Sequence, residues 1–393
     1  MINVEQAPGN FRDSKASVRL DMIRGLAAIL VLISHWKIMF FVDYPLIPTH
    51  RTLFAIPYVL CSAGHQAVLI FFVLSGYLIS GSVFRSLNRN QWQWQSYLTH
   101  RFVRLWLVLI PGLILGALWD WIGLHYGHFP SLYDGSNPKS HAIDIYKTFS
   151  TGTFFGNIAF LQTLSVPSFG SNGALWSLAN EFWYYLFFPL GLFAIGRNTS
   201  TVRRAIYIIL FLLIAWFTRS KILPLFPIWL AGTALALLPS LRIRAWHALA
   251  ASLIYTPLVF LFAKVTFAAD LVQDYLFGIA TFFFIWMLIS TRQPARASVT
   301  TTFARETARF SYTLYLVHMP ALLLLTTFIA GERVWSPTDM RHDLIALAVL
   351  AVLLIYAYLV AAATEFRTDK VRKWVEGKLE SLFGQHSRAS ETV

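Results

Sequence analysis

The sequence predicts an all-α membrane protein: a bundle of about ten transmembrane helices with both termini in the cytoplasm. Three observations predict this fold class. Of the 393 residues, 56% are hydrophobic and only 13% are charged, with 33 Phe and 14 Trp, which is more apolar side chain than a soluble domain buries. The apolar residues fall into about ten runs, most of them long enough to cross a bilayer. The basic residues gather in alternate connecting segments.

Hydropathy gives the approximate bounds of the spans, of which 205–218 is short for a full crossing. The expected spans are 22–41, 67–84, 102–122, 174–196, 205–218, 222–239, 246–264, 273–290, 309–330 and 343–364. With a cytoplasmic N-terminus, 23 of the 32 Lys and Arg fall on the cytoplasmic side, in segments 1–24, 85–104, 197–204, 242–244, 292–309 and 367–393. Cytoplasmic loops carry such an excess, which favours an even number of spans.

The chain is predicted to form one membrane domain, 21–366, between a cytoplasmic segment, 1–20, and a basic, partly disordered cytoplasmic tail, 367–393. The first segment has no apolar core and no cleavage-site pattern, so we expect no removable signal peptide. The longest polar insertion, about 123–173, is expected outside and contains a short apolar stretch, Phe154–Leu164, that suits a re-entrant or surface helix. The net charge of +13 is explained by orientation of the loops, so we expect no nucleic-acid partner.

The first span combines apolar length with two residues that are costly in a membrane, Arg24 and His35. Eleven helical steps separate them, which is a rise of ~16 Å and returns to nearly the same direction, so both side chains lie on one helix face. Asp21, three residues before Arg24, can pair with it. A snorkelling Arg and a hydrogen-bonded structural His would explain each residue alone. The aligned pair favours a functional site.

Two further stretches follow in chain order. The second span, FFVLSGYLISG from Phe71 to Gly81, has a small-xxx-small pattern at Gly76 and Ser80 that is typical of close helix packing, and no G-x-S-x-G motif makes Ser75 a nucleophile. Arg101 and Arg104 then share one face at the start of the third span. Their guanidinium groups suit phosphate oxygens, although basic loops that fix orientation also collect Arg. Spacing alone leaves both interpretations open.

Polar residues also interrupt the fourth and ninth spans. Glu181 lies at the expected extracytoplasmic end of WSLANEFWYYLFFP, where it could orient a His, bind a sugar hydroxyl or pair with a cation. The aromatic residues around it suit an interfacial belt or a sugar platform. In FSYTLYLVHMP, Ser311, Tyr315 and His318 fall on one stripe, which supports a polar interior site.

Taken together, these stretches resemble the acyltransferase 3 family of integral membrane, acyl-CoA-dependent O-acyltransferases. The resemblance rests on five pieces in the family's order, spread over about 19–322: LDMIRGLAAILVLISHW, FFVLSGYLIS, HRFVRLW, WSLANEFWYY and SYTLYLVHMP. Two positions depart from the family's usual pattern: Pro111 comes seven residues after Arg104, and Phe182 stands where many members have a second acidic residue. The hydrolase-like C-terminal domain of some relatives is not expected in this chain.

The resemblance implies transfer of an acyl group, most often acetyl, from cytoplasmic acyl-CoA to a hydroxyl of an extracytoplasmic carbohydrate, at a bacterial inner membrane. Arg24, Arg101 and Arg104 are then expected to hold the CoA phosphates, with His35 further along the path of the pantetheine arm. His35 would act as the general base, since imidazole titrates near working pH, or would itself be acylated. Glu181 would hold or polarise the acceptor, and Asp21, Tyr315 and His318 would support the site. We expect acetyl-CoA or another acyl-CoA as donor, the lipid bilayer as surroundings and no metal.

A multi-helix transporter or lipid flippase with a proton-linked His site is the alternative from another class. Such proteins typically show inverted repeats and spans interrupted by Gly or Pro at matching positions in two halves. We find no such repeat in this sequence. The identity of the acceptor glycan, the acyl chain and the oligomeric state are not indicated by the sequence.

Overall fold

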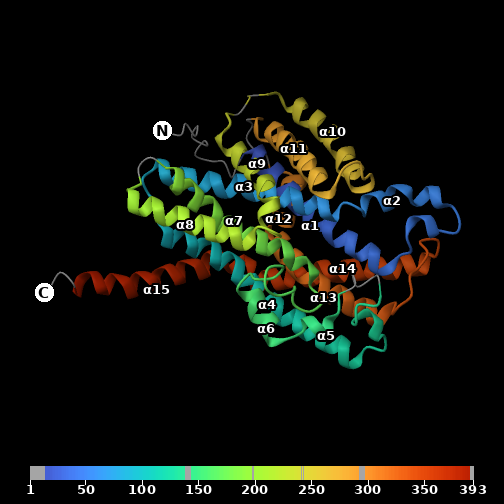
Figure 1. Cartoon of the computed structure of the whole chain (residues 1–393). Coiled ribbons are helices and arrows are strands. Elements are labelled where there is room, and N and C mark those ends of the chain that lie inside the picture. The colour runs from blue at the N-terminus through green and yellow to red at the C-terminus, as the bar shows by residue number, and fades with distance from the viewer. Residues whose placement is uncertain are drawn as a thin grey trace.

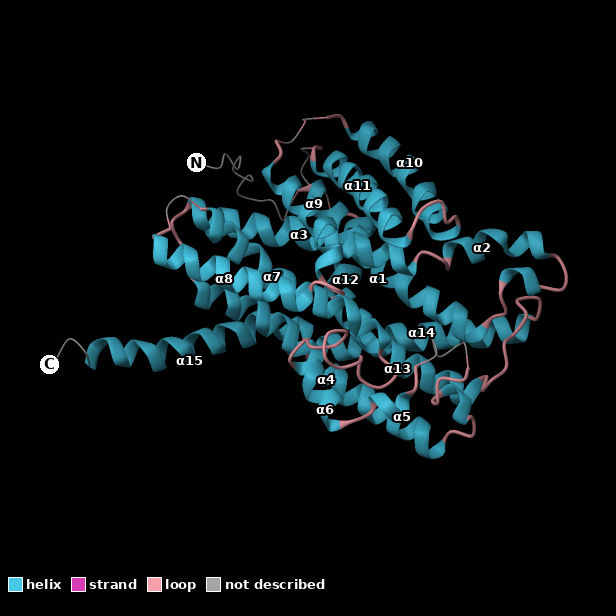
Figure 2. Ribbon diagram, in the orientation of Figure 1, coloured by secondary structure: helices cyan, strands magenta, loops and turns pink. Residues whose placement is uncertain are grey.

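The computed structural model describes residues 14–137, 143–196, 199–239, 241, 243–291 and 297–389. These residues form helices joined by loops, with no named strand among them (Figure 2), so the all-α prediction is confirmed. The long helices are α1 (Lys15–Phe40), α3 (Gly64–Asn88), α4 (Trp94–Tyr126), α7 (Trp176–Ile195), α8 (Thr201–Thr218), α9 (Phe226–Leu237), α10 (Ala245–Lys264), α11 (Asp270–Ile289), α12 (Val299–Arg309), α13 (Ser311–Ile329), α14 (Met340–Ala363) and α15 (Thr368–Ala389).

Within the described residues, eight helices are long and apolar enough to cross a membrane: α3, α4, α7, α8, α10, α11, α13 and α14. They coincide with eight of the ten expected spans, which makes the chain a polytopic membrane protein. The spans expected at 22–41 and 222–239 are also helical, as α1 and α9. However, α1 contains charged residues, and α9 with its preceding turn covers only Leu223–Leu237. The number ten and the sides of the two termini therefore stay predictions.

Helix α1 lies at the centre of the bundle and packs against α3, α12 and α13. Ser14 precedes its first residue and caps the helix, because its side chain accepts a hydrogen bond from the Ser17 N–H. Close packing of α3 against α9 depends on glycine: a Cβ on Gly76 would collide with the Trp229 carbonyl oxygen. The packing role that the sequence suggested for this stretch is therefore observed.

The two ends of the chain are described only in part. The first helix already begins at Lys15, inside the segment 1–20, and residues 1–13 lie outside the described residues. The described part of the tail forms α15 as far as Ala389, and residues 390–393 lie outside the described residues, so the partial disorder expected for 367–393 stays a prediction. Figure 1 shows α15 (red) projecting from the body of the molecule toward the C-terminus. Helix α15 packs against α4, and Nε2 of His100 in α4 lies 2.8 Å from the Glu376 carboxylate of α15.

The polar insertion before α7 folds back onto the bundle. It contains two short helices, α5 (Ile145–Thr148) and α6 (Thr151–Ile158), the second of which overlaps the short helix expected at 154–164. Asp120 of α4 is 1% exposed and holds the end of this segment against the bundle. Its carboxylate accepts hydrogen bonds from the Ser171 N–H (2.8 Å) and the Ser171 hydroxyl (2.6 Å). These bonds bring the residues just before α7 into the bundle interior.

Candidate active site

A narrow cavity of about 90 Å³ lies between α1, α3, α4, α7 and α13. A cavity of this size has room for a few water molecules or a thin chain. Its apolar wall comes mainly from α3. Its polar wall consists of Arg24, Ser75, Arg104, Ser177, Glu181, Tyr185, Ser311, Tyr312 and Tyr315. Charged groups in a membrane bundle are costly and mark functional sites, so this cavity is the candidate active site.

Arg104 differs from the other charged groups that line the cavity in its hydrogen bonding. Its guanidinium group makes no hydrogen bond and no ion pair with any residue that the structure describes. Arg24, in the same cavity, donates to the Ala308 carbonyl oxygen (2.9 Å) and lies 3.8 Å from the Asp21 carboxylate, yet its Nε is buried without a partner. Two guanidinium groups facing one cavity with unused donors form an anion-binding arrangement.

Arg101 lies beside this cavity and not in its wall. Its guanidinium group donates to the Ser82 hydroxyl (3.1 Å) and lies over the rings of Tyr97 and Tyr185, at 5.4 and 5.8 Å from the ring centroids. These contacts hold the guanidinium group of Arg101 against α3 and α7, although its Nε, like that of Arg24, is buried without a hydrogen-bond partner. The structure therefore distinguishes two arginines that the three-residue spacing predicted to act together.

Glu181 lies in the same cavity as the two arginines, although we expected it at the opposite end of the bundle. It forms no ion pair with Arg24 or Arg104; its Oε1 instead accepts hydrogen bonds from Ser75 (3.3 Å) and Tyr185. The expectation assumed that α7 begins at the membrane surface, next to the polar insertion. This placement changes the neighbourhood that we assigned to the carboxylate and leaves its role a prediction.

Helix α7 begins inside the bundle because the residues before it are bonded to α13. The Asn172 side chain donates to the Leu316 carbonyl oxygen (2.7 Å), and the Tyr315 hydroxyl contacts both the Ala174 carbonyl oxygen (2.9 Å) and the Ser177 hydroxyl (2.7 Å). Tyr315 is only the fifth residue of α13. Glu181, one turn after Ser177, therefore lines the cavity with Ser311 and Tyr312 at the beginning of α13.

The two intramembrane histidines meet next to this cavity. Nδ1 of His35 lies 2.9 Å from Nε2 of His318, and the rings are stacked with centroids 5.1 Å apart. His318 is 1% exposed and contacts Tyr315, whose side chain lines the cavity. Arg24 and His35 both point toward the α12–α13 segment, as expected for residues on one face of α1. Neither histidine lines the cavity itself.

Comparison with known protein families identifies this arrangement. A family model described as an acyltransferase domain, acyltransferase 3, matches residues 17–363, nearly the whole chain. The chain belongs to the acyltransferase 3 family. No curated protein and no solved structure matches it. The protein is thus a multi-pass membrane acyltransferase, which decides between the two classes of protein that the sequence left open.

Three residues of the candidate site and its surroundings were missed or given another interpretation from the sequence. Ser75, interpreted as a packing residue, also accepts a hydrogen bond from the Trp229 indole (3.2 Å) and so links α9 to Glu181. Tyr185 follows Glu181 by four residues, a spacing that would have indicated the contact. Glu365 accepts hydrogen bonds from the Thr313 N–H (3.0 Å) and hydroxyl (2.8 Å) at the start of α13, and no local sequence signal indicates this partner.

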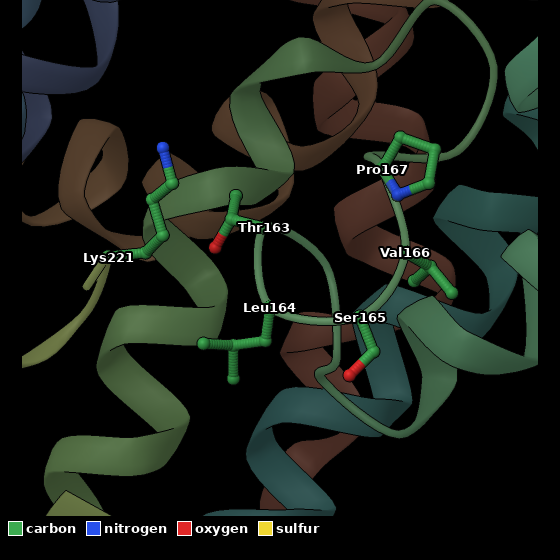
Figure 3. Close-up of a pocket in the computed structure, with 6 residues that line it drawn as sticks. All are labelled: Thr163, Leu164, Ser165, Val166, Pro167 and Lys221. Carbon is green, nitrogen blue, oxygen red and sulfur yellow. The ribbon is translucent and has the colours of Figure 1, made fainter. Parts of the chain in front are cut away.

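A second hollow of the acyltransferase lies at its surface, between the loop 163–167 and Lys221 (Figure 3). Lys221 is its only charged side chain. The hollow is shallow and open, and it contains no buried polar group that would fix the orientation of a ligand.

Across the described ranges, no three His, Cys, Asp or Glu residues lie close enough together to form a metal-binding group.

Proposed function

We propose that this acyltransferase transfers an acetyl group from cytoplasmic acetyl-CoA, or another acyl group from its CoA ester, to a hydroxyl of an extracytoplasmic carbohydrate, at a bacterial inner membrane. The observation that carries the proposal is the Arg104 guanidinium group, which faces the cavity next to Arg24 without a partner among the described residues. A phosphorylated donor supplies the negative charge that such a group is suited to bind.

The narrow cavity limits which part of acyl-CoA can enter it. We place the acyl-pantetheine arm in the cavity, between α3 and α13, and the nucleotide outside it. Arg24 keeps 26% of its side chain exposed, so it can contact a group outside the cavity as well as within it. We therefore assign the phosphates to the Arg24 and Arg104 end, and Arg101 to holding Tyr97 and Tyr185 in place.

His35 serves as the general base in this proposal. It takes the proton of the acceptor hydroxyl as the hydroxyl oxygen bonds to the acyl carbon, the thioester C–S bond breaks, and the CoA thiolate leaves and then receives that proton. Glu181 accepts a hydrogen bond from a second hydroxyl of the carbohydrate and orients it. Asp21 supports the site by pairing with Arg24. Acylation of His35 itself is the alternative route, which would be detected as an acyl-protein formed without acceptor.

The proposal is tested with purified protein in nanodiscs and acetyl-CoA labelled in the acetyl group. We expect slow release of CoA without acceptor and faster release when a soluble oligosaccharide is added, with the label recovered on the oligosaccharide. The Lys221→Ala variant, altered at the surface hollow away from the cavity, should react at the rate of the unaltered protein. No turnover with acetyl-, propionyl- or longer acyl-CoA would overturn the proposed donor.

A further inference from the structure

Both ring nitrogens of His318 have neighbours that define where its proton lies. Its Nδ1 is 2.9 Å from the Tyr315 carbonyl oxygen and 3.0 Å from the Leu314 carbonyl oxygen. A carbonyl oxygen only accepts hydrogen bonds, so Nδ1 must carry the proton. The side chain is 1% exposed, and a second proton would create a charge in the interior of the bundle at high cost. In the neutral ring, Nε2 is therefore an acceptor.

This assignment of His318 also determines the form of His35. Nδ1 of His35 lies 2.9 Å from the accepting Nε2 of His318, so Nδ1 of His35 must be the N–H donor in this hydrogen bond. A neutral His35 then has its basic lone pair on Nε2. The two rings lie 21° from parallel, and α1 and α13 pack together along this stretch, so the orientation of His35 is set by His318 as well.

We propose that His318 is the positioning residue that holds His35 in its Nδ1–H tautomer, so that Nε2 of His35 is the atom that takes the acceptor's proton. This inference rests on the proposed function, because it names the proton-accepting atom of that reaction. A general base oriented by a third group is the usual arrangement in nucleophilic catalysis. In most such sites the third group is a carboxylate. A neutral imidazole performs the same task inside a membrane without adding a buried charge.

The proton balance follows directly. When Nε2 of His35 takes the hydroxyl proton, the ring becomes an imidazolium whose Nδ1–H still donates to Nε2 of His318. The acceptor oxygen has by then bonded to the acyl carbon, and the thioester C–S bond has broken. The departing CoA thiolate takes the proton from Nε2 of His35, which restores the starting tautomer. His318 stays neutral throughout and exchanges no proton.

Two substitutions of His318 separate the acceptor function from packing. In His318→Gln the amide oxygen reaches the position of Nε2 and retains the acceptor, whereas His318→Leu fills the space and removes it. We expect kcat to fall ~100-fold or more in His318→Leu and to stay within ~10-fold of the unaltered protein in His318→Gln, with the KM for acetyl-CoA unchanged in both. Thr326→Val is the matched control, since Thr326 is buried on the same helix and its hydroxyl, among the described residues, donates only to the Leu322 carbonyl oxygen of that helix.

Equal loss of kcat in His318→Leu and His318→Gln, or full activity of His318→Leu, would overturn the positioning role.

A second measurement, magic-angle-spinning NMR of histidine-labelled protein in lipid, does not depend on activity. The variants His35→Gln and His318→Gln assign the signals of these two among the eleven histidines. Protonated Nδ1 on both residues supports the proposal. Protonated Nε2 on His35 overturns it, even in an active enzyme. Unaltered protein that turns over no acyl donor would instead overturn the proposed function, while the NMR would still identify the tautomer.

Discussion

Helices α8 and α13 are nearly equal in length and are both apolar enough to cross a membrane, yet their surroundings are opposite. Only one residue of α8, Thr218, is buried, whereas fourteen of the nineteen residues of α13 are buried. The exposed face of α8 carries Ile206, Ile209, Leu213 and Trp216. These side chains are suited to contact lipid, which is as apolar as a protein interior.

The difference between the two helices lies in their polar residues. Helix α13 carries Ser311, Thr313, Tyr315, His318 and Thr326, all buried. Each of these side chains has a hydrogen-bond partner within the protein. In a membrane the surrounding solvent is apolar, so polar side chains indicate which helix face turns inward. Comparing the two helices indicates that polar residues within an apolar span are a better guide to the candidate site of this acyltransferase than apolar periodicity is.

The largest expected effect is that of His35→Ala, which removes the proposed base beside α13. Acyl transfer should fall by ~10²–10⁴-fold, because the acceptor hydroxyl then loses its proton to water or to no group at all. The matched control is Ile209→Ala on the exposed face of α8, which should leave the rate unchanged. Both variants should express and insert like the unaltered protein. Near-normal modification of the glycan in cells that carry His35→Ala would contradict the assignment.

Arg104→Ala should have the next largest effect, on donor binding. The loss of hydrogen bonds to a charged group, ~1.5–3 kcal/mol, predicts a rise of ~10- to 100-fold in the KM for acetyl-CoA. Arg104→Lys should recover only part of it, since an ammonium group cannot form two parallel hydrogen bonds. Arg101→Ala should raise KM less, because Arg101 already bonds to Ser82 and stacks on Tyr97 and Tyr185. A larger effect at Arg101, or normal CoA binding with altered topology in both variants, would show that the arginines act as orientation signals.

The sequence predicted the positions of the helices and part of the candidate site, whose residue roles stay predictions. Span positions follow from local composition, and the alignment of Arg24 with His35 follows from helix geometry. The depth of Glu181 in the bundle could not be predicted from the sequence. That depth depends on hydrogen bonds of Asn172 and Tyr315, which join segments more than 140 residues apart. The contact of His35 with His318 likewise joins residues 283 positions apart. Spacing can place a polar residue on a helix face, but only the packing of distant segments decides its depth and its partner.

Glu181→Gln tests what the carboxylate does in a cavity that it shares with two arginines. Because a carboxylate repels the phosphates of the donor, removing its charge should leave CoA affinity equal or a few-fold higher. Transfer to the carbohydrate should fall ~10-fold, as expected when a charged hydrogen-bond acceptor becomes neutral. Both quantities should be measured on one preparation. Well-folded Glu181→Gln protein that no longer binds CoA would place the carboxylate on the donor side.

The smallest effect is the most direct test of the comparison, since it makes one substitution, Thr→Val, in each helix. Thr313 of α13 and Thr218 of α8 are both fully buried, but the Thr313 hydroxyl donates to the Glu365 carboxylate (2.8 Å), whereas the Thr218 hydroxyl donates to its own helix at Ile214 (2.7 Å). Thr313→Val removes an interhelical hydrogen bond and leaves part of a carboxylate unsatisfied inside the bundle, so the free energy of unfolding should fall by about 1 kcal/mol. Thr218→Val removes a hydrogen bond from the side chain to the backbone of its own helix, which the helix does not need. The free energy of unfolding should therefore change by less than about 0.5 kcal/mol. Thermal unfolding of both variants in one detergent measures the difference, and equal shifts in Tm would mean that the polar contacts of α13 do not stabilise the bundle more than those of α8.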